Sequence, residues 1–481
     1  MDQLETQLAV VGAGAAGLYT AVRAAREGAQ VTLISATPLA ESSTYWAQGG
    51  LAAALAADDS PERHLRDTVV AGRGAVRESA ARVLCLSAPA AVEDLMKLGV
   101  RFDADRRGHL ALGLEGGHSA RRIVHAGGAA TGRRLIRQLS AIVAEEPRID
   151  VQEGRRATGV LVAGGRCVGV VLQDGTRVAS GGTVLATGGA AALWSRTTNP
   201  GGAVGGGLLL AHGAGAALAD LELVQFHPTA VVGRNGADGF LVTEAIRGEG
   251  AQLLDLAGQR FVDELAPRDE VARAVARQLA LTGTSSVSLD MRAVDPALFP
   301  NVVEALKRAG IDPEHELIPV APAAHYMMGG IATDLDARST LAGLYAVGEC
   351  SCTGLHGANR LASNSLTECF VFGARSARAA LEEPAPELTE ARAWGERPPP
   401  LSLDSREALW CHAGLERDGE GLRQLIGDPY PLVRMVAGSA LAREESRGAH
   451  QRRDFPDLNP KLDGLHVVSR AGAPPALEAW T

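Results

Sequence analysis

The feature that most constrains this chain is a glycine-rich turn between an apolar strand and a helix near the N-terminus. Residues 7–11 are apolar and β-prone, and residues 15–27 have helical periodicity. The turn between them reads Gly12-Ala13-Gly14-Ala15-Ala16-Gly17, which fits G-x-G-x-x-G in the strand–turn–helix context that the motif requires. The first glycine permits a tight turn, the second lets the backbone approach a pyrophosphate, and the third lets the helix pack closely on the strand. This turn therefore predicts a dinucleotide site.

One position departs from the usual dinucleotide pattern. The acidic residue that commonly ends the second strand, here 30–34, is missing, and Ser35 and Ala36 stand there. This argues against a simple NAD(H) dehydrogenase. We expect the ribose to be held by another group, for which the Ser35 hydroxyl is a candidate.

The order of predicted elements indicates that the first domain is left and later re-entered. Strands are expected at 157–163, 166–173 and 183–186, with a hairpin turn at Gly164-Gly165. From about 222 to 326 strands and helices are mixed, with polar residues inside apolar segments. A buried strand is then expected at 344–347, followed by a helix from about Asn364. Prolines predict a linker near 384–402, and the tail to residue 481 is predicted to form two or three helices.

Charge and cysteine usage argue against several classes of protein. The formal net charge is −9, so no basic surface favours nucleic acid or a membrane. The six cysteines form no CxxC pair and no zinc-type set with histidine, so we expect no metal site and reduced thiols in a cytoplasmic protein. No run of about 18 apolar residues lacks interruptions, so no membrane span is expected.

Further motifs resemble the fumarate reductase/succinate dehydrogenase flavoprotein superfamily. The segment similar to its flavin-contacting one is Ser43-Thr44-Tyr45-Trp46-Ala47-Gln48-Gly49-Gly50. The same resemblance continues, in order, through residues 186–189, 225–228, 243–250, 265–269, 322–326, 343–349, 354–360, 363–366 and 445–450. Within the superfamily, Leu114-Glu115-Gly116-Gly117-His118-Ser119, followed by Arg121-Arg122, resembles the L-aspartate oxidase family. The blocks span nearly the whole chain.

The resemblance implies FAD as the cofactor and an α/β architecture of three parts. Residues 1–221 and 327–385 are expected to form a Rossmann-like FAD-binding domain, 222–326 an inserted α+β capping domain, and 403–481 a C-terminal helical domain. Beyond the glycine turn, Ser35 and residues 43–50, FAD contacts are expected from Glu349, Ser365 and Leu366.

Two positions bear on how FAD is held. Relatives with covalently bound FAD have a histidine where Ser43 stands, so FAD is expected to be non-covalent. Gly206 stands where the family usually has an aspartate. One flavin contact is therefore expected to be lost or replaced, with weaker retention of FAD.

The resemblance also implies oxidation of L-aspartate to iminoaspartate, the first step of NAD biosynthesis through quinolinate. Aspartate carries two carboxylates and one ammonium, so its site needs cations or donors for the carboxylates and an anion for the amine. Arg360, after a glycine-rich turn, suits one carboxylate through a bidentate pair. His227 and His325, expected in proline-flanked loops, and Thr243 are candidates for carboxylate binding.

Arg268, Glu244 and Arg247 are the candidate catalytic residues. Arg268 opens a predicted helix, where a cation costs about 0.3–1 kcal/mol that a bound dicarboxylate would offset. Glu244 and Arg247 lie three residues apart and would share a helix face. The resemblance implies a proton path through all three residues. Because a guanidinium hardly deprotonates in proteins, a purely electrostatic role for Arg268, or its pairing with the adjacent Asp269 or Glu270, stays open.

Glu115 is the candidate for reading the substrate's amino group. Succinate and fumarate carry only negative charge, so a carboxylate beside them would repel, whereas aspartate offers an ammonium. The glycines after Glu115 would let its loop approach the ligand, and we expect His118 and Ser119 to hold it by hydrogen bonds.

Two other functions remain open at this stage. A fumarate reductase or succinate dehydrogenase flavoprotein subunit would need an iron–sulfur partner, and this chain has no cluster-type cysteine spacing. A degenerate flavoprotein that binds FAD without catalysis is suggested by Gly206. For an aspartate oxidase, the acceptor is oxygen or fumarate, and unstable iminoaspartate would pass to quinolinate synthase as a possible partner.

Overall fold

The computed structural model describes residues 3–39, 42–233, 236–395 and 398–480. Its largest sheet has the strand order β18-β7-β8-β9-β1-β2-β6, and β16 also pairs with β9. Strands β1, β2, β6, β9 and β16 pair in parallel, whereas β7, β8 and β18 add antiparallel pairs. The strands are β1 (Gln3–Val11), β2 (Val31–Ser35), β6 (Ile149–Glu153), β7 (Ala157–Ala163), β8 (Arg166–Leu172), β9 (Arg177–Leu185), β16 (Leu344–Ala346) and β18 (Arg392–Trp394).

The predicted strand–turn–helix unit opens this sheet. Helix α1 (Ala15–Arg26) follows β1 directly, and β2 lies beside β1. Gly12 has φ +111°, and a Cβ there would lie 2.2 Å from the Ala186 carbonyl oxygen. A Cβ at Gly17 would lie 1.9 Å from the Gly12 carbonyl oxygen. Both positions therefore require glycine, for the reasons the motif predicts.

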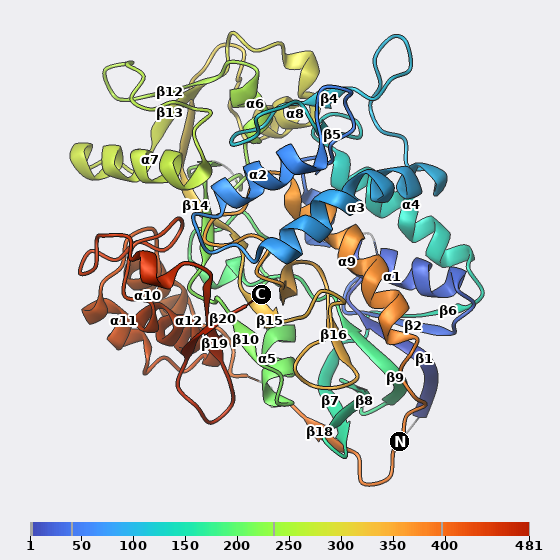
Figure 1. Ribbon diagram of the computed structural model, residues 1–481. Coiled ribbons are helices and arrows are strands. Elements are labelled where there is room, and N and C mark those ends of the chain that lie inside the picture. The colour runs from blue at the N-terminus through green and yellow to red at the C-terminus, as the bar shows by residue number, and fades with distance from the viewer. Residues whose placement is uncertain (1–2, 40–41, 234–235, 396–397, 481) are drawn as a thin grey trace.

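Helices gather on one side of the parallel strands (Figure 1). Helix α1 packs against α9 and α4, and α3 packs against α2 and α9. The strand expected at 344–347 and the helix expected from Asn364 are present, since β16 pairs with β9 in the first sheet and α9 begins at Asn364. These helices are α2 (Pro61–Ala71), α3 (Glu78–Lys97), α4 (Thr131–Glu145) and α9 (Asn364–Ala380). A small sheet of β3 (Leu51–Ala52), β5 (Ile123–Val124) and β4 (Leu112–Gly113) lies beside them.

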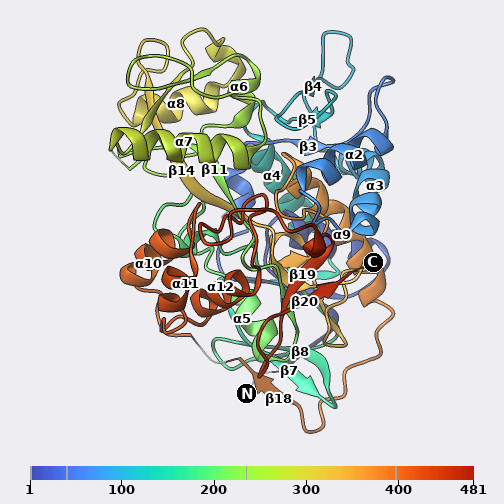
Figure 2. The same cartoon turned by 60° about the vertical axis from the view of Figure 1, so that its left-hand side comes forward.

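Residues 224–327 contribute a separate antiparallel sheet with its own apolar core, at the top of Figures 1 and 2. Its strand order is β11-β14-β13-β12. Val271 and Val275 of helix α7 are buried in that core, as the predicted apolar face of this helix requires. The elements are β11 (Val224–Val231), α6 (Glu244–Gly248), β12 (Gln252–Leu254), α7 (Arg268–Thr282), β13 (Val287–Asp290), α8 (Pro300–Arg308) and β14 (Ile318–Met327).

The C-terminal tail contains three helices, as expected, but it does not end as helix. Helices α10 (Leu403–Ala413), α11 (Gly419–Leu425) and α12 (Pro431–Ala442) are followed by a hairpin of β19 (Leu465–Ser469) and β20 (Ala476–Ala479). Strand β19 pairs with β10 (Leu218–Ala219), in one sheet with β15 (Gly330–Ala332) and β17 (Ser351–Cys352). Strand β19 forms through pairing with β10, about 250 residues away, so the local sequence pattern does not predict it.

The predicted linker near 384–402 also contains structure. Residues Arg392–Trp394 form β18, an edge strand paired with β7. Residues 396 and 397 of this linker lie outside the described residues.

In the described part of the chain, no helix combines the length and apolarity needed to cross a membrane.

A buried ion network joins the C-terminal helices to the rest of the molecule. The guanidinium of Arg443, after α12, has Nε 2.7 Å from Glu222 Oε1 and Nη1 3.1 Å from Glu445 Oε1. All three side chains are inaccessible to solvent. Burial raises the pKa of Glu222 to about 7, against the opposing effect of Arg443. Glu222 directly precedes β11, so the network links segments far apart in sequence.

Replacing Arg443 with methionine will lower the free energy of unfolding by about 3–5 kcal/mol, because Glu222 would stay buried without the guanidinium that pairs with it, while Glu445 would keep only Arg447 as its cation. The measurement is the guanidinium chloride midpoint followed by circular dichroism. Arg470→Met is the matched control, since its pair with Glu478 is half-exposed and a surface pair contributes little. Equal midpoints for the two variants would contradict this role of Arg443.

Candidate functional site

The glycine turn and the segment after residue 42 come together at the start of α1. Gly14 is the N-cap of α1 and supplies no side-chain hydrogen bond to the helix. The Ala15 amide donates to Thr44 Oγ1 at 3.2 Å, and Ser43–Trp46 form a single 3-10 turn beside it. A helix N-terminus leaves backbone donors without intrahelical partners, and here Thr44 takes the one at Ala15, so the other amides of the first turn are those that suit a pyrophosphate.

Several buried polar atoms next to this turn have no partner within the described residues. They are Ser42 Oγ, Gln48 Oε1 and Thr187 Oγ1. Buried polar groups are normally hydrogen-bonded, so these atoms fit a polar group that the chain itself does not supply. Together with the glycine cradle, they make the residues here suitable for FAD.

Three other residues predicted to contact FAD, namely Ser35, Glu349 and Ser365, already make hydrogen bonds within the chain. The buried Ser35 hydroxyl donates to the Thr37 carbonyl at 2.6 Å, so its hydrogen is already used. Glu349 Oε1 accepts the Met327 amide at 3.0 Å, and burial raises the pKa of Glu349 to about 7. Ser365 Oγ accepts from Arg360 at 3.1 Å, which places the start of α9 against the candidate substrate residues.

Arg268 and Arg360, from distant segments, meet at one amide. Gln225 Oε1 accepts from Arg268 Nη1 at 3.2 Å and from Arg360 Nη2 at 3.1 Å. Gln225 Nε2 donates to Asn359 Oδ1 and to the Arg360 carbonyl. Gln225 was not among the predicted site residues, although it opens the block at 225–228. A buried amide beside two arginines is the functional position that sequence reasoning missed.

The three predicted catalytic residues form one buried group. Arg268 Nε lies 2.5 Å from Glu244 Oε2, and Arg247 Nη2 lies 3.7 Å from the same oxygen. Glu244 Oε1 accepts the Gly116 amide at 2.8 Å, which connects the group to the loop of Glu115. The alternative of local pairing for Arg268 is wrong, because Asp269 pairs with Arg73 and Arg273, and Glu270 with Arg73.

Some guanidinium nitrogens of this group make no hydrogen bond in the part of the chain that the structure describes, although Arg247 Nη2 has the longer ion pair with Glu244. They are Arg247 Nε, Arg247 Nη2 and Arg360 Nε. Burial lowers the pKa of Arg360 to about 10, and Arg268 adds to this effect. Buried donors with a surplus of positive charge favour an anionic ligand, and two carboxylates would meet this need.

The two candidate histidines lie side by side on strands, not in loops. His227 is on β11 and His325 on β14, and their ring centroids are 5.1 Å apart. Thr198 Oγ1 lies 2.8 Å from His325 Nδ1. Burial, followed by the charge of Arg268, holds the pKa of both rings well below 6.5. Both are therefore neutral at pH 7 and can donate to a carboxylate without adding charge.

Thr243 caps the helix that carries Glu244 and Arg247. It is buried and is the N-cap of α6, but its side chain makes no cap hydrogen bond. The backbone therefore places Thr243 directly before Glu244, at the edge of the charged group. This placement is compatible with the predicted contact between Thr243 and a substrate carboxylate.

Glu115 is buried, with 2% of its side chain exposed, so it is not a surface acid. Ser363 Oγ donates to Glu115 Oε2 at 2.6 Å, and His125 Nε2 lies 3.6 Å from Oε1. Burial acts to raise the pKa of Glu115, but His125, Arg268 and Ser363 outweigh it and lower the pKa to about 2. The carboxylate is ionised at neutral pH.

The expectation that His118 and Ser119 hold Glu115 is wrong for their side chains. His118 Nε2 pairs with the Ala362 carbonyl at 2.9 Å, and Ser119 Oγ donates to Asp67 at 2.8 Å. Ser363 and His125, from segments that sequence proximity could not indicate, take their place.

Known proteins resemble this chain over nearly its whole length. A sequence family described as an FAD binding domain matches residues 7–366, and one described as fumarate reductase flavoprotein C-term matches 427–470. A curated L-aspartate oxidase from Caulobacter vibrioides is 44% identical over 493 residues, covering 94% of each chain. The chain belongs to the L-aspartate oxidase family. A second curated L-aspartate oxidase, from Mesorhizobium japonicum, is 45% identical and covers 93% of this chain and 91% of its own.

Members of the L-aspartate oxidase family are flavin-dependent oxidoreductases, and FAD is the cofactor of this chain. The fold is also that of fumarate reductase flavoproteins. The E. coli quinol fumarate reductase FrdA has a TM-score of 0.89 at 28% identity, covering 99% of this chain and 97% of its own. The chain is 28% identical to FrdA but 44% and 45% identical to the two L-aspartate oxidases, so its sequence is more similar to those of the oxidases.

FAD will be released completely from the protein by acid precipitation, because Ser43 cannot form the histidyl link expected at that position in covalent relatives. The measurement is flavin absorbance in the supernatant and in the redissolved pellet. Yellow colour that stays with the denatured chain would refute non-covalent binding.

Restoring the acid at residue 206 will tighten FAD binding. Gly206 begins helix α5 (Gly206–Gly213), and a Cβ there meets no atom within 4 Å. Gly206→Asp should therefore fold normally and lower the Kd for FAD about two- to tenfold, the value of one hydrogen bond. Gly201→Asp, also with open space around its Cβ, is the control. Equal Kd values for both variants, measured by flavin fluorescence, would show that residue 206 does not reach FAD.

Proposed function

We propose that this protein catalyses FAD-dependent oxidation of L-aspartate to iminoaspartate, the first step of NAD biosynthesis through quinolinate. The observation that carries the proposal is the buried carboxylate of Glu115, which Ser363 and His125 hold beside a group of guanidinium nitrogens that lack hydrogen bonds. This pattern complements a ligand with two carboxylates and one ammonium. Neither succinate nor fumarate would use Glu115.

The carboxylates of aspartate are bound by the arginine group in this proposal. Arg360 presents an unpartnered Nε, and its guanidinium carbon lies 4.6 Å from the centre of the Tyr326 ring. This stacking fixes the plane of the guanidinium for a bidentate pair. Arg268, with His227 and His325 as neutral donors, takes the second carboxylate, since the charge of Arg268 already acts on both rings.

The ammonium is bound by Glu115, which orients the C2–H bond of aspartate. Oxidation removes a hydride from C2 and one proton from the ammonium, which passes through the paired Glu115 carboxylate to solvent, and a carbon–nitrogen double bond is left. When bound, FAD supplies the redox chemistry by accepting the hydride at N5. The protein holds the substrate in one orientation, and burial keeps water from competing for its charges.

Glu244 and Arg247 fix the position and the charged surroundings of the Arg268 guanidinium. Glu244 Oε2 holds Arg268 Nε and also faces Arg247, so a proton relay and a fixed charge clamp are both compatible with the contacts. In the oxidation direction the clamp is sufficient, because no proton has to reach C2. In fumarate reduction, a proton delivered from Arg268 would be replaced through Glu244 and Arg247.

The alternative of a succinate dehydrogenase or fumarate reductase subunit is less well supported, since it leaves Glu115 without a purpose. The degenerate-flavoprotein alternative is disfavoured by the complete charged group. Anaerobic mixing of the purified protein with L-aspartate, and separately with succinate, tests all three functions. Bleaching of flavin absorbance with aspartate alone supports the proposal, with succinate supports the dehydrogenase, and with neither supports the non-enzyme.

The remaining parts of the proposal are its acceptor, partner, location and domain division. We propose oxygen or fumarate as the electron acceptor, quinolinate synthase as the enzyme that consumes iminoaspartate, and the cytoplasm as the location.

The division of the chain into domains at residues 221, 326, 385 and 403 remains a prediction. Limited proteolysis, with mass spectrometry of the fragments, would test these boundaries.

Glu115→Gln will lower kcat/KM for aspartate oxidation by about thirty- to several-thousand-fold, as expected for losing one partner of a buried charge pair. Fumarate reduction should persist or improve, because fumarate has no ammonium. Both activities are measured on one preparation with its FAD content determined. An equal loss in both activities, or no loss in either, would remove the main support for aspartate as substrate.

Arg268→Lys will lower turnover with both aspartate and fumarate at least about a hundredfold, because lysine keeps the charge but loses the planar fork. FAD content should not change. Arg273→Lys is the matched control, since Arg273 lies on the same helix and pairs with Asp269 outside the charged group. Near-normal turnover of Arg268→Lys would overturn its assignment.

A further inference from the structure

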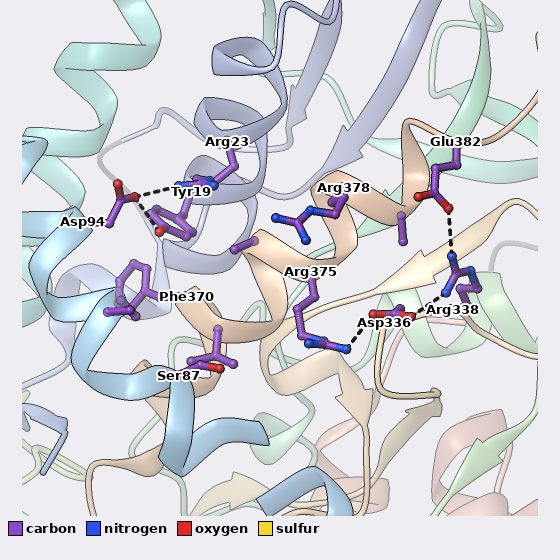
Figure 3. A pocket seen from close by; sticks show the side chains of 15 residues that line it. Tyr19, Arg23, Ser87, Asp94, Asp336, Arg338, Phe370, Arg375, Arg378 and Glu382 are labelled. Carbon is purple, nitrogen blue, oxygen red and sulfur yellow. Dashed lines mark hydrogen bonds and ion pairs between the residues drawn. The ribbon is translucent and has the colours of Figure 1, made fainter. Parts of the chain in front are cut away.

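A cavity of about 420 Å³ lies apart from the candidate FAD and substrate groups, between α1, α3, α9 and the turn at 334–338 (Figure 3). It lies against the second half of α9, whereas Ser365 and Leu366 are at the start of that helix. The lining includes Ala90, Ala91 and Ala374, and these short side chains leave the space open. This volume is sufficient for a small metabolite.

Cations dominate the charged lining of this cavity. Four guanidinium groups, from Arg23, Arg338, Arg375 and Arg378, face three carboxylates, from Asp94, Asp336 and Glu382. Figure 3 shows these side chains arranged around one hollow, with the carboxylates at its two sides. Asp334 and Arg26 pair with Arg338 and Asp94 from outside the lining, so five guanidinium groups meet four carboxylates and one positive charge is left uncompensated.

Each of the carboxylates is already engaged. Asp94 pairs with Arg23 at 3.3 Å and accepts the Tyr19 hydroxyl at 2.7 Å. Asp336 pairs with both Arg338 and Arg375 at 2.8 Å. Asp94 also pairs with Arg26, which lies outside the cavity lining, so that carboxylate is shared between two cations.

Arg378 has no ion pair or hydrogen bond from its side chain in the described part of the chain. It lies one helical turn beyond Arg375 on α9, so both side chains project on the same side of the helix. Figure 3 shows the Arg378 guanidinium extending toward the hollow. A planar guanidinium with free donors is suited to bidentate contact with phosphate or carboxylate oxygens.

We propose that this cavity is a second ligand site, which binds a compact polyanion such as a phosphate ester or a tricarboxylate. Arg378 is the primary contact and Arg375 the second. The rings of Tyr19 and Phe370 are buried against each other, with centroids 5.1 Å apart, so their faces are not free for stacking. The site therefore selects charge and not an aromatic base. A ligand here would bridge α1, α3 and α9 and stabilise their packing.

The experiment uses the FAD-saturated protein, so that pyrophosphate cannot occupy the FAD site. Inorganic pyrophosphate and citrate are titrated separately at constant ionic strength, because screening by added salt would otherwise change stability on its own. Thermal unfolding and isothermal calorimetry give the half-saturating concentration. We expect a saturable rise in Tm, and at least about a tenfold weaker response in Arg378→Gln, the loss expected for one charged hydrogen bond.

Arg137→Gln is the matched control, because Arg137 is exposed on α4 and lies outside the cavity. It should respond to both anions like the unchanged protein. Both Arg378 and Arg137 are exposed, so neither variant should lose FAD or fold poorly. The absence of a saturable response to either anion, an unchanged response in Arg378→Gln, or equal weakening in both variants would overturn the proposal.

Discussion

The buried guanidinium groups of Arg268 and Arg360 meet at Gln225, a third, that of Arg247, shares Glu244 with Arg268, and the segments that form the site are arranged to hold them. Burying a guanidinium without partners is strongly unfavourable, so each one needs a specific acceptor or an aromatic face. Glu244 pairs with Arg268 and Arg247, while Arg360 stacks on Tyr326. Because these residues come from β11, α6, α7, β14 and the loop before α9, the charge requirement binds the inserted sheet to the FAD-binding elements. The donors left without acceptors define what the ligand has to supply.

The same constraint explains the unusual start of α9. Ser363 has φ 60° and ψ 0°, a left-handed conformation that is unfavourable for a residue other than glycine, and its side chain does not cap the helix. Its hydroxyl instead donates to Glu115, and the next residue, Asn364, pairs with His64 at 2.7 Å. The helix expected to contact FAD is thus connected directly to the carboxylate that is proposed to bind the amine. The unfavourable backbone conformation of Ser363 is thus offset by its hydrogen bond, which sets the position of the Glu115 carboxylate.

A feature could be predicted from the sequence when it depends on residues that are close together along the chain. The glycine turn, α1, the β7–β8 hairpin and the start of α9 could be predicted because each depends on residues adjacent in sequence. The hairpin at the C-terminus could not, because β19 is a strand only through its pairing with β10. His118 and Ser119 were expected to hold Glu115 because they are its neighbours, but their side chains pair with Ala362 and Asp67. His227 and His325 were predicted as a pair of ligands without any indication that two strands would bring them together.

The sequence by itself determined the cofactor turn, the class of fold and the identity of the charged residues, since steric rules and residue chemistry act over short distances. Tertiary structure alone decided which charges meet. It placed Gln225 between Arg268 and Arg360, and it brought Ser363 and His125 to Glu115. These contacts join residues up to about 250 positions apart, and electrostatic energies depend on distance and burial in space. The protonation states on which the proposed chemistry rests are therefore properties of the folded chain.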